Sequence, residues 1–374
     1  MFLLFETIAI LVGVIIGAGI LGIPYVVAQC GFLIGFINFV FLSLIVVFIN
    51  LCLGEITLRT KERYQLIGYA GKYFGRNGKY LMFFLWLLAN YGSLLVYMIG
   101  GGEVLSAIFS GRLLFYSFLF WTIGAVLVYF GLNIIKKAEF LMVMVILVMV
   151  VLVGLISFGH IDISHLVYFN INKFFLPYGV ILYALWGMIA IPEMREVLKG
   201  KEELLKKAIL WGSVIPVIIY SFFALAVIGV TGISTTEIAT IGLGKVLGKG
   251  MVLFGNVFAI FAMMTSFLVV GLGQKSVFYY DYKMSNFLSW LFTFSIPLVA
   301  LLLGMRGFTK NMALVGAVSE GLVGVMVITM YWRAKRLGDR SPEFSFMSLK
   351  GSQIAGSIII LILIGGIDYT LISV

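Results

Sequence analysis

GVIIGAGILGIPYVVAQCG, residues 13–31, contains the spacing Gly17-x-Gly19-x-x-Gly22, followed by a proline. The same glycine spacing occurs in dinucleotide-binding folds, where a strand precedes it, a helix follows it and an acidic residue stands about twenty positions on. Here the next acidic residue is Glu55, and another apolar stretch lies in between. We therefore interpret the stretch as an interrupted helix inside a membrane.

Composition supports a membrane environment for the whole chain. Its 374 residues are 62% hydrophobic and 11% charged, with a mean hydropathy of +1.14, whereas a soluble domain carries about 25% charged residues. Because about 20 apolar residues are needed to cross a bilayer, we predict an all-α polytopic membrane protein surrounded by lipid. The eleven predicted spans are 6–29, 33–57, 80–109, 113–133, 139–159, 174–196, 208–231, 251–273, 287–304, 311–332 and 353–373.

The basic residues of the loops predict an orientation in the cell membrane. With a cytoplasmic N-terminus, 20 of the 26 Lys and Arg residues fall in cytoplasmic loops, as the positive-inside rule requires. The C-terminus is then external. The net charge of +10 comes from residues that flank the spans, where anionic lipid is the expected partner. We therefore expect no binding to nucleic acid.

Two short motifs indicate an internal repeat. GILGIP, residues 19–24, lies in the first predicted span, and GMIAIP, residues 187–192, lies in the sixth. The two spans run in opposite directions, and interrupted helices at matching positions of inverted repeats are typical of transporters. We predict one domain over 1–374, made of a first half (1–159), an inverted second half (174–332) and an extra span (353–373).

The first motif predicts a break in the helix near the middle of the membrane. Gly17 and Gly19 lower helix propensity, and Pro24 lacks the N–H that would bond to the carbonyl of Ile20. We expect an unwound stretch at 17–20. Unpaired backbone groups survive in a bilayer only where they line a cavity, so this break is a candidate binding site.

The second motif predicts a matching break in the sixth span. Gly187 and Pro192 are expected to interrupt the helix and to free the carbonyl of Met188. The N-terminus of a half-helix favours a carboxylate, and free carbonyls at a half-helix C-terminus favour an ammonium group or a sodium ion. Two breaks side by side therefore suit the zwitterionic part of an α-amino acid.

These motifs carry a family resemblance. Residues 13–31 and LYALWGMIAIPE, residues 182–193, resemble the first- and sixth-span motifs of amino acid permeases in the amino acid–polyamine–organocation superfamily. The branch that they resemble is the amino acid/auxin permease group with its bacterial aromatic amino acid relatives. The resemblance implies a LeuT-type fold, with five plus five inverted spans, broken first and sixth helices, an eleventh span and transport by alternating access.

The resemblance also implies where a substrate would bind. Its carboxylate would meet N–H groups around Ala18, Gly19 and Ile20, and its ammonium would meet carbonyls near Tyr183. The candidate substrate-binding residues are Gly17, Ala18, Gly19, Ile20, Tyr183, Ala184, Trp186, Gly187, Asn90 and Ser93, with Tyr97 as a further wall residue. The glycines could instead serve only close helix packing, which is common in membranes.

A sodium site is implied in the eighth predicted span. Ala262, Thr265 and Ser266 match the A-x-x-T-S pattern that binds a structural sodium in this fold, with the carbonyls of Gly13 and Ile16 as partners. Adjacent Thr and Ser can also bond back to the preceding turn. In the auxin-permease branch an Asn often stands at the position of Gly13, and its absence here weakens the match. The fifth predicted span has no Lys in residues 140–159, which argues against proton coupling.

Glu320 stands near the middle of the tenth predicted span, where a carboxylate is costly and indicates function. We consider it as a gate, as a proton carrier, or as the satisfied partner of a nearby hydroxyl. Overall the sequence predicts a sodium-coupled importer of a neutral, aromatic or branched amino acid, a monomer or weak oligomer, with no enzymatic constellation, no cofactor and no metal other than sodium. The alternatives are a proton-coupled transporter or exchanger, a non-transporting amino acid sensor and a channel.

Overall fold

The computed structural model describes residues 2–130 and 148–373, and every regular element in these ranges is helical. The main helices are α1 (Phe2–Ile15), α2 (Gly19–Cys30), α3 (Phe32–Arg59), α4 (Leu66–Phe109), α5 (Leu113–Phe130), α7 (Ser164–Val167), α8 (Tyr178–Leu185), α9 (Ile191–Val197), α10 (Leu205–Thr231), α11 (Ala239–Leu247), α12 (Lys249–Tyr280), α13 (Asn286–Leu302), α14 (Phe308–Leu314), α15 (Gly321–Leu337) and α16 (Leu349–Ser373).

The helices follow the apolar stretches of the sequence. Seven described helices are long and apolar enough to cross a membrane, or eight when α1 and α2 are taken as one span bent by 61°. Shorter apolar helices occupy Val148–Phe158 and Asn286–Leu302, and α8 with α9 covers the sixth predicted span. Part of the predicted span 139–159, residues 139–147, lies outside the described residues.

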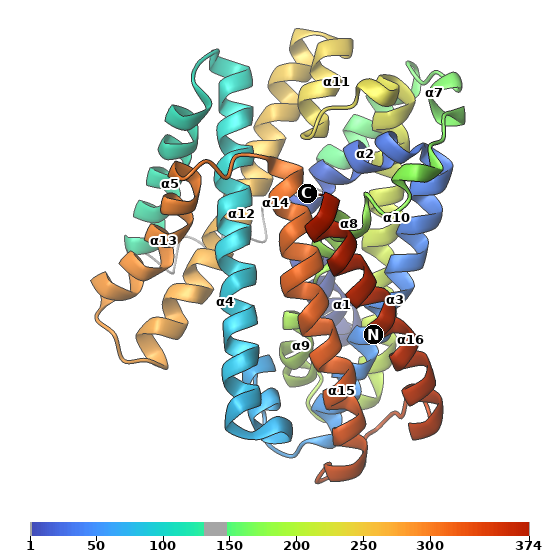
Figure 1. Cartoon of the computed structure of the whole chain (residues 1–374), viewed down its shortest axis with the longest axis vertical. Helices are drawn as coiled ribbons and strands as arrows, with labels where there is room; N and C mark the ends of the chain where they lie inside the picture. The colour runs from blue at the N-terminus through green and yellow to red at the C-terminus, as the bar shows by residue number, and fades with distance from the viewer. Residues whose placement is uncertain (1, 131–147, 374) are drawn as a thin grey trace.

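The helices form two groups that meet along α4 (Figure 1). α5, α12 and α13 gather on one side of α4 and pack against it and one another, whereas α1, α2, α3, α8 and α10 form the other group. α15 contacts α3, α4 and α16, so it joins the two groups. The two half-helices α1 and α2 thus lie inside the bundle, with α10, α3 and α8 packed around them.

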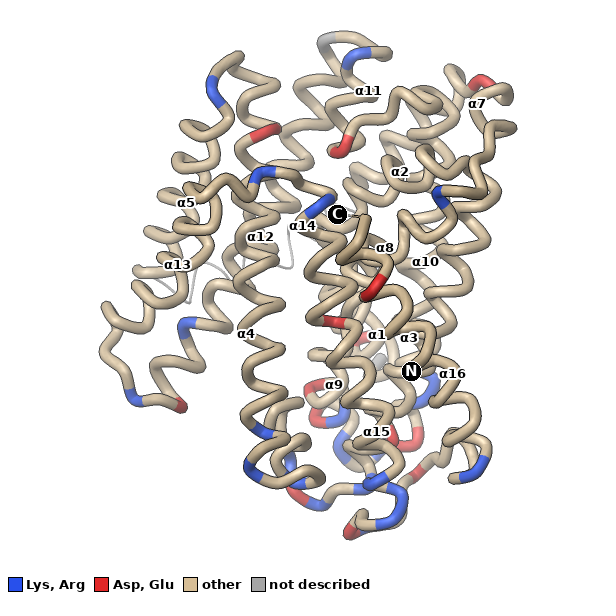
Figure 2. Tube along the Cα trace, viewed as in Figure 1, with Lys and Arg blue, Asp and Glu red and all other residues tan. Residues whose placement is uncertain are grey.

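Basic side chains gather at one end of the molecule. Figure 2 shows most Lys and Arg residues at the end where α4 begins and α15 ends, and only a few at the opposite end. α4 itself is kinked there, because Gly75 has a positive φ of 73° that separates an initial segment from the long span. We refer to this end below as the basic end.

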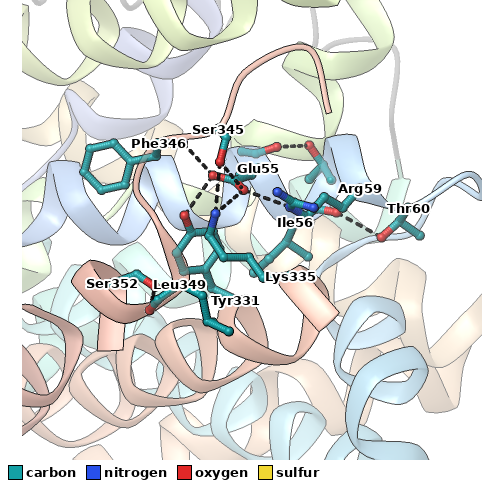
Figure 3. A network of polar contacts seen from close by, with 12 residues as sticks. Glu55, Ile56, Arg59, Thr60, Tyr331, Lys335, Ser345, Phe346, Leu349 and Ser352 are labelled. Atoms are coloured by element: carbon teal, nitrogen blue, oxygen red, sulfur yellow. Dashed lines mark hydrogen bonds and ion pairs between the residues drawn. The ribbon is translucent and has the colours of Figure 1, made fainter. Parts of the chain in front are cut away.

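A buried carboxylate fastens three elements together at the basic end (Figure 3). Glu55, near the end of α3, has no exposed side-chain surface and accepts bonds from Arg59 Nε at 2.8 Å and Lys335 Nζ at 2.9 Å. Three neutral donors complete the set: the Tyr331 hydroxyl at 2.8 Å, the Ser345 hydroxyl at 3.2 Å and the Phe346 N–H at 2.6 Å. α3, α15 and the segment before α16 are therefore tied at one point.

A second carboxylate holds the same connecting segment. Asp339 accepts bonds from the Lys61 N–H at 2.7 Å and from the Lys72 ammonium, and its own N–H donates to the Arg59 carbonyl at 3.0 Å. The hydrogen bond from Lys72 keeps the pKa of the Asp339 carboxyl below its usual value. The link between α15 and α16 is thereby fixed against α3 and the start of α4.

Candidate functional site

The first predicted span is broken, close to the predicted position. α1 ends at Ile15 and α2 begins at Gly19, so the break covers residues 16–18 rather than the predicted 17–20. Gly19 and Ile20 belong to the first turn of α2 instead of the unwound stretch. The shift follows from the bonds that close this turn, since the Ile20 N–H donates to the Gly17 carbonyl at 3.4 Å and the helix resumes directly after the bend.

The proline of this motif does not mark the break. Pro24 lies inside α2, at its sixth residue. A proline there removes the bond to the Ile20 carbonyl, as predicted, but the preceding turn is held by other bonds, including that from the Leu21 N–H to the Ala18 carbonyl at 3.1 Å. The glycines therefore carry the break, because a missing side chain lowers helix propensity at the residues themselves.

A tyrosine from a distant helix bonds to the edge of the first break. Tyr220 on α10 is fully buried, and its hydroxyl donates to the Ile15 carbonyl at 2.6 Å. One side chain thus satisfies the last carbonyl of α1, directly before the break. Nothing in the local sequence identified Tyr220.

The sixth predicted span is broken as well. α8 ends at Leu185, Trp186 and Gly187 are not helical, and a short 3-10 turn at Met188–Ala190 leads into α9. Pro192 occupies the first turn of α9, where its missing N–H costs no helical bond.

One part of this prediction was wrong. The Met188 carbonyl is not free, because it accepts the N–H of Ile191 at the end of the 3-10 turn. The expectation assumed that an α-helix would continue through Pro192. The chain instead forms a 3-10 turn at this point, in which a carbonyl bonds to the N–H three residues later. The Met188 carbonyl therefore accepts from Ile191, before Pro192 is reached.

The two breaks touch each other at glycines. A Cβ placed on Gly19 would lie 2.6 Å from the Ala184 Cα and 2.8 Å from its Cβ, closer than any side chain can approach. A Cβ on Gly187 would collide with the side chains of Ile15 and Leu11. Both glycines are therefore required for close approach, and this contact places the start of α2 against the end of α8.

A cavity of about 170 Å³ opens beside the two breaks. It contains most of the predicted site residues, which come from α1, α2, α4, α8, α12, the two breaks and the π-helical segment Val315–Glu320. They are Gly13, Ile16, Gly17, Ala18, Gly19, Asn90, Ser93, Tyr97, Tyr183, Ala184, Trp186, Thr265, Ser266 and Glu320. Three predicted residues, Ile20, Gly187 and Ala262, are buried behind this wall and do not line it. Lining residues that the sequence did not single out include Leu66, Trp86, Ile189, Val269 and Val323.

The hydroxyls of the predicted sodium site lie in this wall but bond within their own helix. Thr265 donates to the Phe261 carbonyl at 2.8 Å and the Ala262 carbonyl at 2.9 Å, and Ser266 donates to Ala262 at 3.0 Å. A Cβ on Gly17 would lie 2.9 Å from the Ser266 Oγ. The first break is thus adjacent to the Ser266 hydroxyl, and Thr265 lines the same cavity.

Glu320 lies at an irregular turn that faces the same cavity. Residues Val315–Glu320 form a π-helical segment between α14 and α15, a feature common at functional sites. A Cβ on Gly316 would collide with the Gly179 carbonyl and the Tyr183 N–H, so the segment packs directly against the backbone of α8. Among the described residues Oε2 of Glu320 has no hydrogen-bond partner, which does not fit a carboxylate satisfied by a hydroxyl.

Away from the basic end, the helices around the cavity pack tightly. A Cβ on Gly22 of α2 would lie 3.0 Å from the Met312 sulfur, and one on Gly100 of α4 would lie 2.7 Å from Phe308. Glu237 fixes the start of α14, since it accepts from the Thr309 N–H and hydroxyl, both at 2.8 Å. The cavity instead reaches toward the basic end, where Leu66 begins α4.

Comparisons with known proteins agree with this architecture. The chain shares 26% identity over 353 residues, 87% of its own length and 86% of the relative's, with the tyrosine-specific transport system 1 of Haemophilus influenzae. It shares 22% identity over 372 residues, 95% of each chain, with glutamine transporter 2 of Aliivibrio fischeri.

Solved structures show the same fold. MhsT in complex with L-phenylalanine superposes with a TM-score of 0.67 at 13% identity, covering 97% of this chain and 98% of that one. Mhp1, a nucleobase-cation-symport-1 family transporter, gives 0.65 at 14% identity over 98% and 91% of the two chains. Both are transporters of the LeuT-type fold, so the predicted fold class is confirmed. The sequence profile of the tryptophan/tyrosine permease family matches residues 3–371, and this multi-pass membrane protein therefore belongs to that family of amino acid transporters.

Proposed function

We propose that this protein imports a neutral amino acid by sodium-coupled alternating access. The observation that carries the proposal is the contact between the two broken spans, at Gly19 and Ala184, beside a cavity that also contains Thr265 and Ser266. Backbone N–H groups at the start of α2, backbone carbonyls at the end of α8 and a candidate cation site then lie around one cavity. The relatives' names refer to tryptophan, tyrosine and glutamine, which all have uncharged side chains.

The substrate would be held mainly by backbone groups. Its carboxylate would accept from N–H groups at Ala18 and Gly19, at the start of α2, where the helix dipole favours negative charge. Its ammonium would meet carbonyls at the end of α8, near Tyr183 and Ala184. Asn90, together with Ser93 and Tyr97 in the same wall, would contact the side chain.

The coupling ion would bind beside the first break. Its ligands would be the Gly13 and Ile16 carbonyls, the Ala262 carbonyl and the two hydroxyls of Thr265 and Ser266. Both hydroxyls donate their hydrogens to helix carbonyls, so the lone pairs of their oxygens remain available to the ion. Sodium that binds here would hold α1 against α12 and favour the closed state around the substrate.

The structure fits an inward-facing state of the transport cycle. The cavity reaches toward the basic end, which the positive-inside rule places in the cytoplasm, and the opposite side is closed by the packing of Gly22 and Gly100. In this orientation the N-terminus is cytoplasmic and the C-terminus external, in the cell membrane, with the protein as a monomer or weak oligomer. The assignment to the amino acid–polyamine–organocation superfamily and its auxin-permease branch belongs to the same proposal.

Uptake into proteoliposomes tests the proposal. Radiolabelled tyrosine, tryptophan and glutamine are offered with a sodium gradient, with a proton gradient and with neither. We expect accumulation driven by sodium that is lost in Thr265→Ala and kept in the control Thr122→Ala, a residue with the same back-bond on α5. Accumulation driven by protons and lost in Glu320→Gln would favour proton coupling, and binding without accumulation would favour a sensor.

A further inference from the structure

Among the described residues that line the cavity, Glu320 alone has an ionisable acidic or basic side chain, and no described residue satisfies its buried oxygen. It is 3% exposed, and its Oε2 has no hydrogen-bond partner among residues 2–130 and 148–373. Buried polar groups in native proteins are nearly always paired, so an unpaired one calls for an explanation. A ligand group that enters the cavity can supply the missing partner.

Glu320 reaches the cavity from the π segment, which lies outside the two helix breaks. The π segment that carries it packs on α8 and on α4, and Tyr97 of α4 and Tyr183 of α8 line the same cavity as Glu320. The Tyr183 hydroxyl, whose residue lines the same cavity, also makes no hydrogen bond among the described residues. The first break and Ser266 also line the cavity, and a Cβ on Gly17 would lie 2.9 Å from the Ser266 Oγ.

We propose that Glu320 is a specificity-determining residue: its carboxyl group, with the Tyr183 hydroxyl, accepts a hydrogen bond from the side chain of the transported amino acid. This inference rests on the proposed function, because it assumes an amino acid bound at the two breaks. The site then selects side chains that carry an O–H or N–H, such as a phenol, an indole or a carboxamide, over apolar side chains of the same size. A carboxyl group accepts a hydrogen bond whether or not it is protonated.

The selection follows from the cost of leaving this group unpaired. When an apolar side chain fills the pocket, the carboxyl group stays buried without water and without a partner, and the substrate loses affinity for that reason. Sites that hydrogen-bond a substrate group reject analogues without it far more strongly than pockets that sense only size. We expect tyrosine to bind about 10- to 100-fold more tightly than phenylalanine, and glutamine more tightly than methionine.

Binding, rather than transport, is the measurement that separates this role from ion coupling. The full-length protein, purified in detergent with sodium, is titrated calorimetrically with the 20 common amino acids. Three variants follow: Glu320→Leu, which removes the acceptor, Glu320→Gln, which keeps a carbonyl oxygen, and Glu103→Gln, a carboxylate of α4 that does not line the cavity. We expect the tyrosine-to-phenylalanine ratio to fall to about one in Glu320→Leu, to keep its direction in Glu320→Gln and to be unchanged in Glu103→Gln.

Each other outcome has a defined meaning. If wild-type protein binds tyrosine and phenylalanine equally, or if Glu320→Leu weakens both to the same extent, the Glu320 carboxyl group does not select the substrate side chain, and this inference is wrong while the proposed function stands. If none of the 20 amino acids binds, the proposed function and this inference fall together. The wild-type ratio needs no variant, so misfolding of Glu320→Leu does not prevent a decision.

Discussion

Replacing Glu55 by glutamine should destabilise the protein by about 3 kcal/mol. The change keeps the shape of the side chain but leaves Lys335, whose side chain is 6% exposed, without its counter-charge. Removing one partner of a buried ion pair costs about 3–5 kcal/mol. We place the cost of Glu55→Gln at the lower end of this range. The Arg59 side chain is 17% exposed to solvent, and Lys335 retains a bond to the Ser345 hydroxyl at 3.0 Å.

Thermal unfolding in detergent, followed by tryptophan fluorescence, measures this effect. At about 2 °C per kcal/mol for a chain of this size, Tm should fall by roughly 6 °C in Glu55→Gln. The exposed Glu193, which has no ion pair among the described residues, is the matched control. Glu193→Gln should change stability by less than about 0.5 kcal/mol.

A double variant tests the reason for the loss. Adding Lys335→Met to Glu55→Gln removes the stranded ammonium and should restore most of the lost stability, since apolar replacements of buried pairs are often neutral. Lys335→Met alone should cost less than Glu55→Gln, because Glu55 keeps Arg59 and three neutral donors. If Glu55→Gln unfolds at the wild-type temperature, or if the double variant is the least stable of the three, the buried pair does not hold this end together.

Three further changes test the site. Gly19→Val should abolish calorimetric binding of substrate, because a Cβ there would lie 2.6 Å from the Ala184 Cα; unchanged binding would remove this glycine from the site. Tyr220→Phe should weaken substrate binding by about tenfold with little change in the amount of folded protein, since the carbonyl at the end of α1 loses its donor; equal affinity in the two proteins would contradict a positioning role. Gly316→Val should lower Tm by several degrees, because its Cβ would collide with the backbone of α8, and a variant as stable as wild type would show that the π segment can shift.

The sequence predicts features whose cause is local. Glycine weakens a helix at its own position, so Gly17 and Gly19 locate the first break to within one or two residues, and Gly187 locates the second. Apolar runs are also local, and helices occupy most of the described parts of the predicted spans, apart from the breaks. The error at Met188 is also local, because it concerns only whether a neighbouring N–H, that of Ile191, donates to the Met188 carbonyl.

Features that depend on distant partners could not be predicted this way. Tyr220 stands 205 residues from Ile15, whose carbonyl it bonds, and nothing near it marks it as part of the break. Glu55 lies near the end of a predicted span, but four of its five partners come from residues 276 to 291 positions later. Such contacts exist only once the helices have packed.

The π segment separates the rotation of α14 about the helix axis from that of α15 within the tenth span. An α-helix turns by about 100° per residue, so one additional residue in a turn rotates everything after it around the helix axis. The start of α14 must present Thr309 to Glu237, and α15 must present Tyr331 and Lys335 to Glu55. In a regular helix the rotation of α15 relative to α14 would be fixed by the number of residues between them. The wider turn at Val315–Glu320 changes this rotation, so that each end can meet its own partner. Deleting one residue of this turn would therefore rotate one anchor away from its carboxylate, although the deletion lies in neither anchor.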